Sequence, residues 1–382
     1  MRIGQRLANL VVSDIRSMSR ASDAMGGINL GQGICDLPTP APVADAAKRA
    51  IDENRVVYTA PEGIAPLRRA IADKIRREHD LSFDPDGEVV VTMGATGAFA
   101  ATCLALFDPG DEVILFEPYY GYHLNTVLTM GLVPVLVPTK PPGWGFDREV
   151  LERAVTPKTR AIVVCTPSNP SGKVWQPEEL DVVADLCARR DLVAVTDEIY
   201  EHILFDGVRH APLSTRPGAR ERTISISGFS KTFAITGWRL GWLTAPAEAA
   251  RRIVVAHDLL YVCAPTPLQH AMLDALAMPT SYFDDLSSKY ATKRAILCDA
   301  LQAAGFEPYR PAGAYYVLAD ARRLGQPDAK AAAMTLLERA KVASVPGTSF
   351  YKDPIGESLL RFCFAKEDDV LIEAGRRLQA AF

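Results

Sequence analysis

The stretch RAIVVCTPSNPSGKVWQPEELDVVADLCARRDLVAVTDEIY, residues 160–200, predicts the fold class. Short runs rich in β-branched residues open and close it, at 160–165 and 192–196, and a helical pattern over 177–190 separates them. Two parallel strands need a crossover connection, which is usually a helix. The stretch therefore predicts a β-α-β unit of a parallel sheet that is covered by helices.

The same alternation continues on both sides of this stretch. Further strand patterns occupy residues 88–93, 112–116 and 223–227, and a further helical pattern occupies 96–107. Strands that alternate with helices indicate an α/β sheet with both faces covered. We expect a large domain at 46–265.

Both ends of the chain have a different texture. Helical patterns cover 266–278, 282–304 and 328–340, and strand patterns cover 314–318 and 359–364. These predict a smaller α+β domain over 266–382. Residues 1–45 are rich in Gly and Pro, which favour an arm and a small-domain segment over an independent core.

Composition excludes several classes of protein. The chain has 382 residues, 42 Lys and Arg against 46 Asp and Glu, and a formal net charge of -4, so no basic field for nucleic acid is expected. The longest apolar run, about ten residues over 98–107, is too short to span a membrane. The seven cysteines show no C-x-x-C spacing, which argues against a metal site and favours a reducing, cytoplasmic location.

Polar groups follow the predicted strands, where an α/β sheet binds its ligands. Asp197 and Tyr200 follow one strand, and Asn169 lies in the proline-stiffened loop after another. Ala95 and Thr96 open a helix whose free N–H groups suit a phosphate, although such a turn is also a common helix start.

Lys231 is the most distinctive of these residues. Between Thr223 and Trp238 it is the only charged residue, and apolar side chains surround it in the sequence. Desolvation lowers the pKa of an amine and frees it to act as a nucleophile in Schiff-base chemistry. Arg239 supplies a cation eight residues later. An amine, an acid, a phenol, an amide and an anion site together are what pyridoxal 5'-phosphate requires.

The run SGFSKTFAITGWRLG, residues 227–241, resembles the cofactor-lysine signature of the class I/II aminotransferases, the fold-type I family of pyridoxal phosphate enzymes. The resemblance covers nearly the whole chain. It implies a large domain with a mostly parallel, seven-stranded type of sheet. It also implies that Lys231 forms a Schiff base with the cofactor and then moves the proton between substrate Cα and the cofactor. Asp197 is expected to pair with the pyridine nitrogen, and Tyr200 and Asn169 are expected to bind the O3′ oxygen. The implied phosphate ligands are Ala95, Thr96, Ser230 and Arg239.

The resemblance implies further roles elsewhere. Tyr120 is expected to stack on the cofactor ring, and Tyr58 to reach the phosphate in a neighbouring subunit, which implies a homodimer with shared active sites. Arg361 is expected to bind the substrate α-carboxylate in a pocket lined by Gly33, and Asn169 is also expected to bind the substrate. One position departs from the family: the serine or threonine that many members carry three residues before the lysine is Gly228.

The expected activity is transfer of the α-amino group of an L-amino acid to a 2-oxo acid through a pyridoxamine form of the cofactor. A lyase, cyclase or oxidase that uses the same cofactor remains open, as does a non-catalytic cofactor-binding protein. Substrate identity also stays open. The side-chain pocket is expected to draw on Ile15, Arg16, Ile34, Tyr58, Tyr122, His123 and residues near Tyr261. Arg16 suits an acidic side chain if it is not simply solvated.

Overall fold

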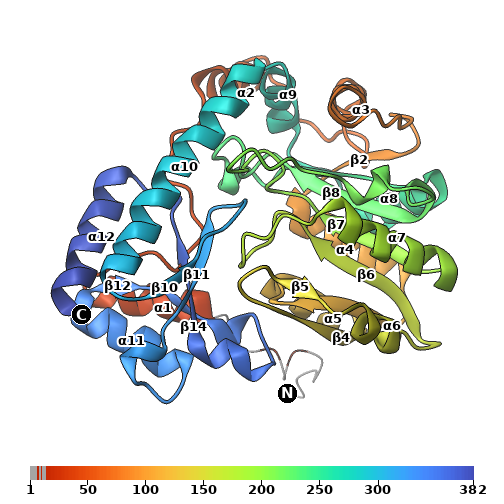
Figure 1. Cartoon of the computed structure of the whole chain (residues 1–382). Helices are drawn as coiled ribbons and strands as arrows, with labels where there is room; N and C mark the ends of the chain where they lie inside the picture. Colours follow the sequence, from red (N-terminus) through yellow and green to blue (C-terminus); the bar gives the residue numbers. More distant parts are fainter. Residues whose placement is uncertain (1–6, 8–9, 11–13) are drawn as a thin grey trace, which may run out of the picture.

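An eight-stranded sheet forms the centre of the computed structural model, which describes Leu7, Leu10 and residues 14–382 (Figure 1). The other residues of the expected N-terminal arm, 1–6, 8–9 and 11–13, lie outside the described residues. In sheet order the strands are β2 (Val89–Thr92), β9 (Gly241–Thr244), β8 (Thr223–Gly228), β7 (Val193–Asp197), β6 (Thr159–Cys165), β3 (Glu112–Glu117), β4 (Val133–Lys140) and β5 (Gly145–Phe146).

The sheet is mostly parallel, as expected. Strands β8, β7, β6, β3 and β4 pair in parallel, while β9 is antiparallel to both of its neighbours and the two-residue β5 adds an antiparallel edge to the seven expected strands. The carboxyl ends of β2, β3, β6, β7 and β8 therefore meet at one edge. The strand pattern did not identify β4, which contains Pro134 and Pro138. Prolines are tolerated near a sheet edge but obscure the pattern.

Helices cover both faces of this sheet. On one face lie α4 (Gly94–Leu106), α5 (Gly121–Thr129) and α8 (Ala247–Tyr261). On the other lie α6 (Arg148–Ala154) and α7 (Pro177–Arg190). At the β2 end lie α2 (Ala41–Asp52), α3 (Ala65–His79) and α9 (Thr266–Leu276). Neighbouring residues of one strand enter opposite cores, because Val113 packs in the first cluster and Ile114 in the second.

The helix α7 shows how local sequence sets an element. Pro177 occupies its first turn, and Gln176 and Glu179 form a capping box that satisfies free N–H groups. Asp191 ends the helix in a left-handed conformation with φ 53°. The helix covers 177–190, as the pattern predicted.

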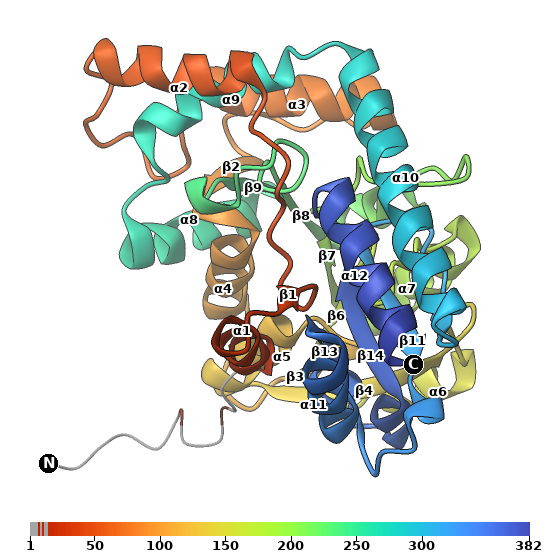
Figure 2. The ribbon, with the colours of Figure 1, turned by 90° about the vertical axis from the view of Figure 1, so that its left-hand side faces the viewer.

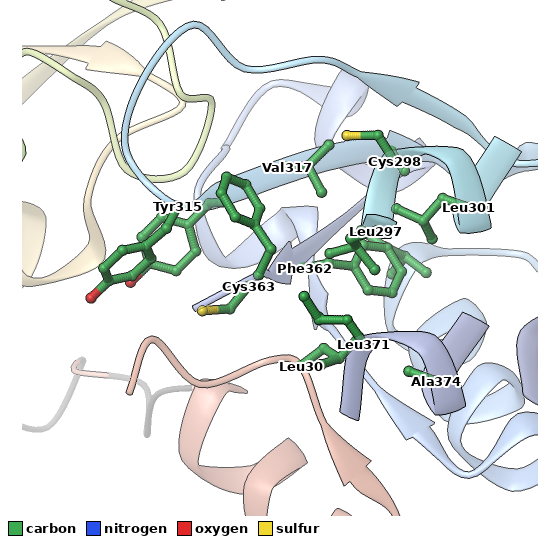
Figure 3. Close-up of a cluster of buried hydrophobic side chains, with 14 of the residues drawn as sticks. Leu30, Leu297, Cys298, Leu301, Tyr315, Val317, Phe362, Cys363, Leu371 and Ala374 are labelled. Atoms are coloured by element: carbon green, nitrogen blue, oxygen red, sulfur yellow. The ribbon is translucent and has the colours of Figure 1, made fainter. Parts of the chain in front are cut away.

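The second domain contains an antiparallel sheet in the order β10-β11-β14-β13. Its strands are β10 (Glu307–Tyr309), β11 (Tyr316–Asp320), β14 (Leu359–Cys363) and β13 (Val345–Pro346). Its helices are α10 (Thr280–Ala303), α11 (Ala329–Ala340) and α12 (Asp368–Ala381). The N-terminal segment joins it, because β1 (Ile28–Asn29) pairs with β12 (Val342–Ala343) and α1 (Asp14–Ala24) packs beside them. Leu30 lies in the core with Leu371 and Phe362 (Figure 3).

One strand of the second domain starts later than the sequence pattern indicated. The strand expected at 314–318 begins at Tyr316, because Ala314 has φ +58° and cannot continue the ladder. Helix α9 buries Ala271 and Met272 against the core of α2 and α3. We propose that the large domain extends through α9 and that the boundary lies at the start of α10. In the described part of the chain, no helix is long and apolar enough to cross a membrane.

Candidate active site

A cavity of about 430 Å³ lies at the carboxyl ends of the parallel strands and is closed by residues of the second domain. It brings together the residues that the sequence singled out at separate strand ends. The expected site residues that line it are Gly33, Ala95, Thr96, Tyr120, Asn169, Asp197, Tyr200, Ser230, Lys231, Arg239 and Arg361. The expected pocket residues Ile15, Arg16, Ile34, Tyr122 and His123 line it too, while Tyr58 and Tyr261 do not.

Lys231 follows β8 and lines the cavity, where its side chain is partly exposed. Its Nζ lies 5.9 Å from the ring centroid of Tyr200 and 5.7 Å from that of Tyr315. Burial lowers the pKa of Lys231 from its usual 10.5 to about 8, and the cation of Arg239 adds to this effect. An amine with this pKa is available as a nucleophile close to neutral pH.

Asp197 ends β7 and is held in place from two sides. Its Oδ2 lies 3.0 Å from Nε2 of His123, and its Oδ1 accepts a hydrogen bond of 3.3 Å from the N–H of Ile199. Both Asp197 and His123 are buried. A buried, fixed carboxylate favours a cation beside it, such as a protonated ring nitrogen. The sequence did not assign His123 this partner, because its contact with Asp197 joins α5 to β7.

A cradle for an anion lies at the start of α4. Ala95 and Thr96 stand in the first turn, whose N–H groups have no intrahelical partner, and no side chain caps them. Arg239 approaches this turn closely: a Cβ at Gly94 would lie 2.8 Å from its Nη2. Ser230 lines the same cavity. Helix N–H groups, a guanidinium and a hydroxyl form a donor set for a phosphate.

Gly228 is packed on every side. A Cβ there would lie 2.9 Å from Cα of Gly241, 3.0 Å from Cδ1 of Ile199 and 3.0 Å from the carbonyl oxygen of Leu240. Gly228 pairs with Gly241 across β8 and β9, so the strands approach closely where the usual family residue carries a hydroxyl. The donors to an anion must therefore come from the other residues of the cradle.

Arg361 is a buried cation without a carboxylate partner in residues 14–382. It is 1% exposed, and it donates from Nη1 to Oδ1 of Asn169 (2.8 Å) and from Nη2 to the carbonyl oxygen of Gly31 (2.6 Å). Its guanidinium lies 4.4 Å from the ring centroid of Tyr316 and 4.7 Å from that of Phe350. Its Nε has no hydrogen-bond partner. These features suit a carboxylate ligand, because a buried cation needs a counter-charge.

Two tyrosines connect the cofactor side of the cavity to this cation. The hydroxyl of Tyr200 donates to that of Tyr316 over 3.3 Å, and a Cβ at Gly33 would lie 1.8 Å from the same Tyr316 oxygen. Burial raises the pKa of Tyr316 to about 12 and that of Tyr200 well above its usual range, so both hydroxyls remain neutral donors. The sequence placed Tyr316 inside the strand expected at 314–318 but gave it no role. Its only signal was a pair of tyrosines in an apolar run.

The remaining aromatic residues divide between the cavity and the surface. Tyr120 lines the cavity and stacks on Tyr122 at 5.3 Å, while the ring of His123 meets it edge-on at 5.1 Å. Tyr58 lies in the loop between α2 and α3 with 81% of its surface exposed. It is therefore free to contact another subunit.

Comparisons with known proteins agree with this geometry. A family model described as "Aminotransferase class I and II" matches residues 26–377. The chain is 39% identical to the "Probable N-succinyldiaminopimelate aminotransferase DapC" of Mycobacterium tuberculosis, over 98% of this chain and 97% of that protein. It is 39% identical to the "Aspartate/prephenate aminotransferase" of Thermus thermophilus, over 85% and 83%. The solved structure of the Mycobacterium tuberculosis enzyme has a TM-score of 0.97 at 38% identity and covers 100% of both chains.

Proposed function

The chain belongs to the class I and II aminotransferases and is an aminotransferase, and from this premise we propose that it uses pyridoxal 5'-phosphate to move the α-amino group of an L-amino acid to a 2-oxo acid. The observation that carries the proposal is the amine of Lys231, with its lowered pKa, in one cavity with Asp197, an anion cradle and the unneutralised Arg361. Product analysis distinguishes this activity from a lyase, a cyclase, an oxidase and a non-catalytic cofactor-binding protein.

The side chains of the cavity fit the cofactor. Ala95, Thr96, Ser230 and Arg239 would hold its phosphate, and Asp197 would hold its ring nitrogen in the protonated form. Tyr200 would turn its hydroxyl proton from Tyr316 to the phenolic oxygen of the cofactor, Asn169 would donate its amide N–H to the same oxygen, and Tyr120 would cover the ring. When bound, the cofactor supplies an aldehyde and an electron-withdrawing ring.

Lys231 would hold the cofactor through its amine and would also serve as the base. Its lowered pKa would leave the amine unprotonated, so that it could accept the proton from substrate Cα. Arg361 fixes the α-carboxylate, and the hydroxyl of Tyr316 lies between Arg361 and Tyr200. These contacts orient the Cα–H bond toward Lys231 and keep water away from the reacting atoms.

We propose that the enzyme is a homodimer in which Tyr58 completes the partner's phosphate site. The loop that carries Tyr58 also exposes Val57 (72%), and α8 exposes Leu259 (80%) and Val255 (68%). Large exposed apolar side chains on neighbouring elements favour an interface. All seven cysteines are free, which supports the proposed reducing, cytoplasmic location.

A subunit-mixing experiment tests the shared site. Inactive Lys231→Ala protein is mixed with weakly active Tyr58→Ala protein under conditions that exchange subunits. In a hybrid, the site with an intact Lys231 receives an intact Tyr58 from the other chain, so activity should rise above the sum of the two parents. If mass spectrometry demonstrates the hybrids but activity does not rise, Tyr58 acts in the active site of its own subunit and the shared site is wrong.

The reaction itself is tested by product analysis. Wild-type enzyme with an active amino donor should require a 2-oxo acid acceptor for continued turnover and should release the donor's 2-oxo acid without free ammonia. Lys231→Ala should fold normally and lose this activity. Ammonia release without an acceptor would indicate a lyase or oxidase, and a spectrum that no amino acid changes would indicate a non-catalytic cofactor-binding protein.

The names of the relatives point to substrates of several kinds. They include N-succinyldiaminopimelate, aspartate and, for the 35% identical mouse protein "Kynurenine--oxoglutarate transaminase 3", kynurenine and oxoglutarate. We propose that this enzyme also acts in amino acid metabolism. The names alone do not select its substrate, so the selection must be sought in the cavity.

A further inference from the structure

Arg16 lies at the wall of the active-site cavity, on the first turn of α1. Its neighbours in the helix hold it there. Ile15 packs against the core that contains Phe350, and Met18 is 4% exposed in the core of the second domain. The guanidinium of Arg16 is thus carried by a docked helix, although its side chain is exposed.

Hydrogen bonds fix this helix relative to the cavity. Asp14 accepts from the hydroxyl of Ser349 at 2.9 Å, and the backbone of Ser349 lies beside the start of α5 at Gly121. One turn after Asp14, the hydroxyl of Ser19 donates to the carbonyl oxygen of Ile15 at 2.8 Å, and its Oγ lies 3.3 Å from Oε1 of Gln32, which also lines the cavity. Figure 2 shows α1 below β1, the short strand that the chain forms directly after this helix. Arg16 lies between these two attachments, at the mouth of the cavity.

The cation of Arg16 has no counter-charge in residues 14–382. The neighbouring acid, Asp14, is paired with Lys330 at 3.1 Å. Residues 1–13 contain no Asp or Glu, so the preceding segment cannot supply one. The cavity wall contains one carboxylate, that of Asp197, and His123 binds it. Arg16 therefore faces a space that contains no free acid of the described chain.

Other groups at this side of the cavity are also donors. The side chain of Gln32 brings an amide NH₂ group, which is a donor, to the cavity wall. Tyr122 and Thr126 contribute hydroxyls from α5. A guanidinium, an amide NH₂ and two hydroxyls form a donor-rich wall that suits a second anionic group on the ligand.

We propose that Arg16 binds the side-chain carboxylate of an acidic amino acid while Arg361 binds its α-carboxylate. The substrate class is therefore a dicarboxylic amino acid and the matching dicarboxylic 2-oxo acid. This inference rests on the proposed function. Arg16 acts as a specificity residue that lies in the same chain as the cavity it serves.

The test compares acidic donors with their neutral amides. Glutamate and glutamine, like aspartate and asparagine, differ little in shape, so their kcat/KM ratio isolates the contribution of the charge. The half-reaction is followed by the cofactor absorbance in wild type, Arg16→Met and Arg16→Lys. Inhibition by glutarate, which does not react, measures binding alone. The matched control is Arg20→Met, which removes an exposed cation one turn later on α1 that does not line the cavity.

We expect Arg16→Met to lower the acid-to-amide ratio about 10- to 100-fold, as for loss of a charge-assisted hydrogen bond, and to weaken glutarate to a similar extent. Arg16→Lys should keep most of the ratio, and Arg20→Met should leave it unchanged. An equal loss for acids and amides in Arg16→Met, or an unchanged ratio, would overturn the inference. If wild type converts no amino acid at all, the proposed function fails instead.

Discussion

At the scale of single residues, the site depends on charges that the protein buries without neutralising them. Lys231 lacks an ion-pair partner in the described chain, and Arg361 is stacked between two rings with no carboxylate beside it. Burial of an unpaired cation costs free energy, and that cost is offset when a ligand supplies the missing charge or bond. The functional residues can therefore be recognised as charged groups that have no ion-pair partner inside the described chain.

The lowered pKa of Lys231 predicts a pH profile. In cofactor-free enzyme, the ammonium form has no lone pair, so the rate at which Lys231 captures the cofactor aldehyde should rise with pH and reach its midpoint near pH 8. A rapid-mixing absorbance assay from pH 6 to 10 measures it. A midpoint near 10.5, the usual value of a lysine, would show that the amine is not desolvated before the cofactor binds.

Arg361 predicts a change in substrate affinity. Arg361→Lys keeps the charge but loses the planar pair of donors, so kcat/KM for every amino donor should fall by about 10- to 100-fold, equivalent to roughly 1.5–3 kcal/mol. The change should be mainly a rise in KM, and the affinity of the enzyme for the cofactor should not change. A loss of cofactor affinity would mean that Arg361 supports the cofactor and not the substrate.

The site residues that the sequence predicted either follow a predicted strand or lie in one contiguous signature. Asp197, Asn169 and Lys231 were found this way, and the cavity unites them. The partnership of His123 with Asp197 and the position of Tyr316 could not be found, because each depends on contacts between separate elements. The single sequence contains no signal for such contacts.

At the scale of elements, close packing behind the site limits what each strand can carry. The close packing around Gly228 predicts that a serine at this position destabilises the folded protein. Gly228→Ser should lower the free energy of unfolding by about 1–3 kcal/mol because its Cβ meets β9, and it should not strengthen phosphate binding. Urea unfolding of the cofactor-free protein measures the first effect and cofactor titration the second. Tighter cofactor binding would show that the hydroxyl reaches the cavity.

A buried ion pair joins α3 to the loop after β7. The amine of Lys74 lies 2.7 Å from Oε2 of Glu201, and both groups are buried. Burial alone would raise the pKa of Glu201, but the cation of Lys74 and three neighbouring histidines together hold that pKa well below its usual range. The ion pair therefore contributes stability above pH 4.5, and this contribution is lost as the pH falls.

Lys74→Met leaves Glu201 buried without its cation. We expect a loss of about 3–5 kcal/mol in the free energy of unfolding at pH 7, and a smaller loss at pH 4, where Glu201 can take up a proton. The control is Lys48→Met, which breaks an exposed pair with Asp45 and should cost less than about 1 kcal/mol. An equal loss at both pH values would mean that the charge of Glu201 is not the cause.

Element positions were predictable because each strand and helix carries its own pattern. Helix α7 has the predicted bounds, and β6 and β7 lie within one residue of them. The predicted start of β11 was wrong because Ala314 adopts a left-handed conformation that an alanine in the sequence does not indicate. Packing of α9 on α2 was not predictable either, since it joins residues more than 200 positions apart.

At the scale of the whole molecule, the cavity exists because two domains and the N-terminal segment meet over one sheet edge. The large domain contributes Lys231 and Asp197, the second domain contributes Arg361 and Tyr316, and α1 contributes Arg16. Long α10 joins the two domains (Figure 1). The chemistry is thus positioned by the sheet of the large domain, while selection of the substrate belongs to the elements that close over it.

The most direct test of the central claim is a single half-reaction. Wild-type enzyme with bound cofactor is mixed with one amino acid and no acceptor, and both the cofactor absorbance and the released product are followed. Conversion of the cofactor to its aminated form, with one equivalent of the matching 2-oxo acid per site, is the predicted result. Ammonia or an eliminated side chain, with the cofactor returned to its starting form, would contradict the account.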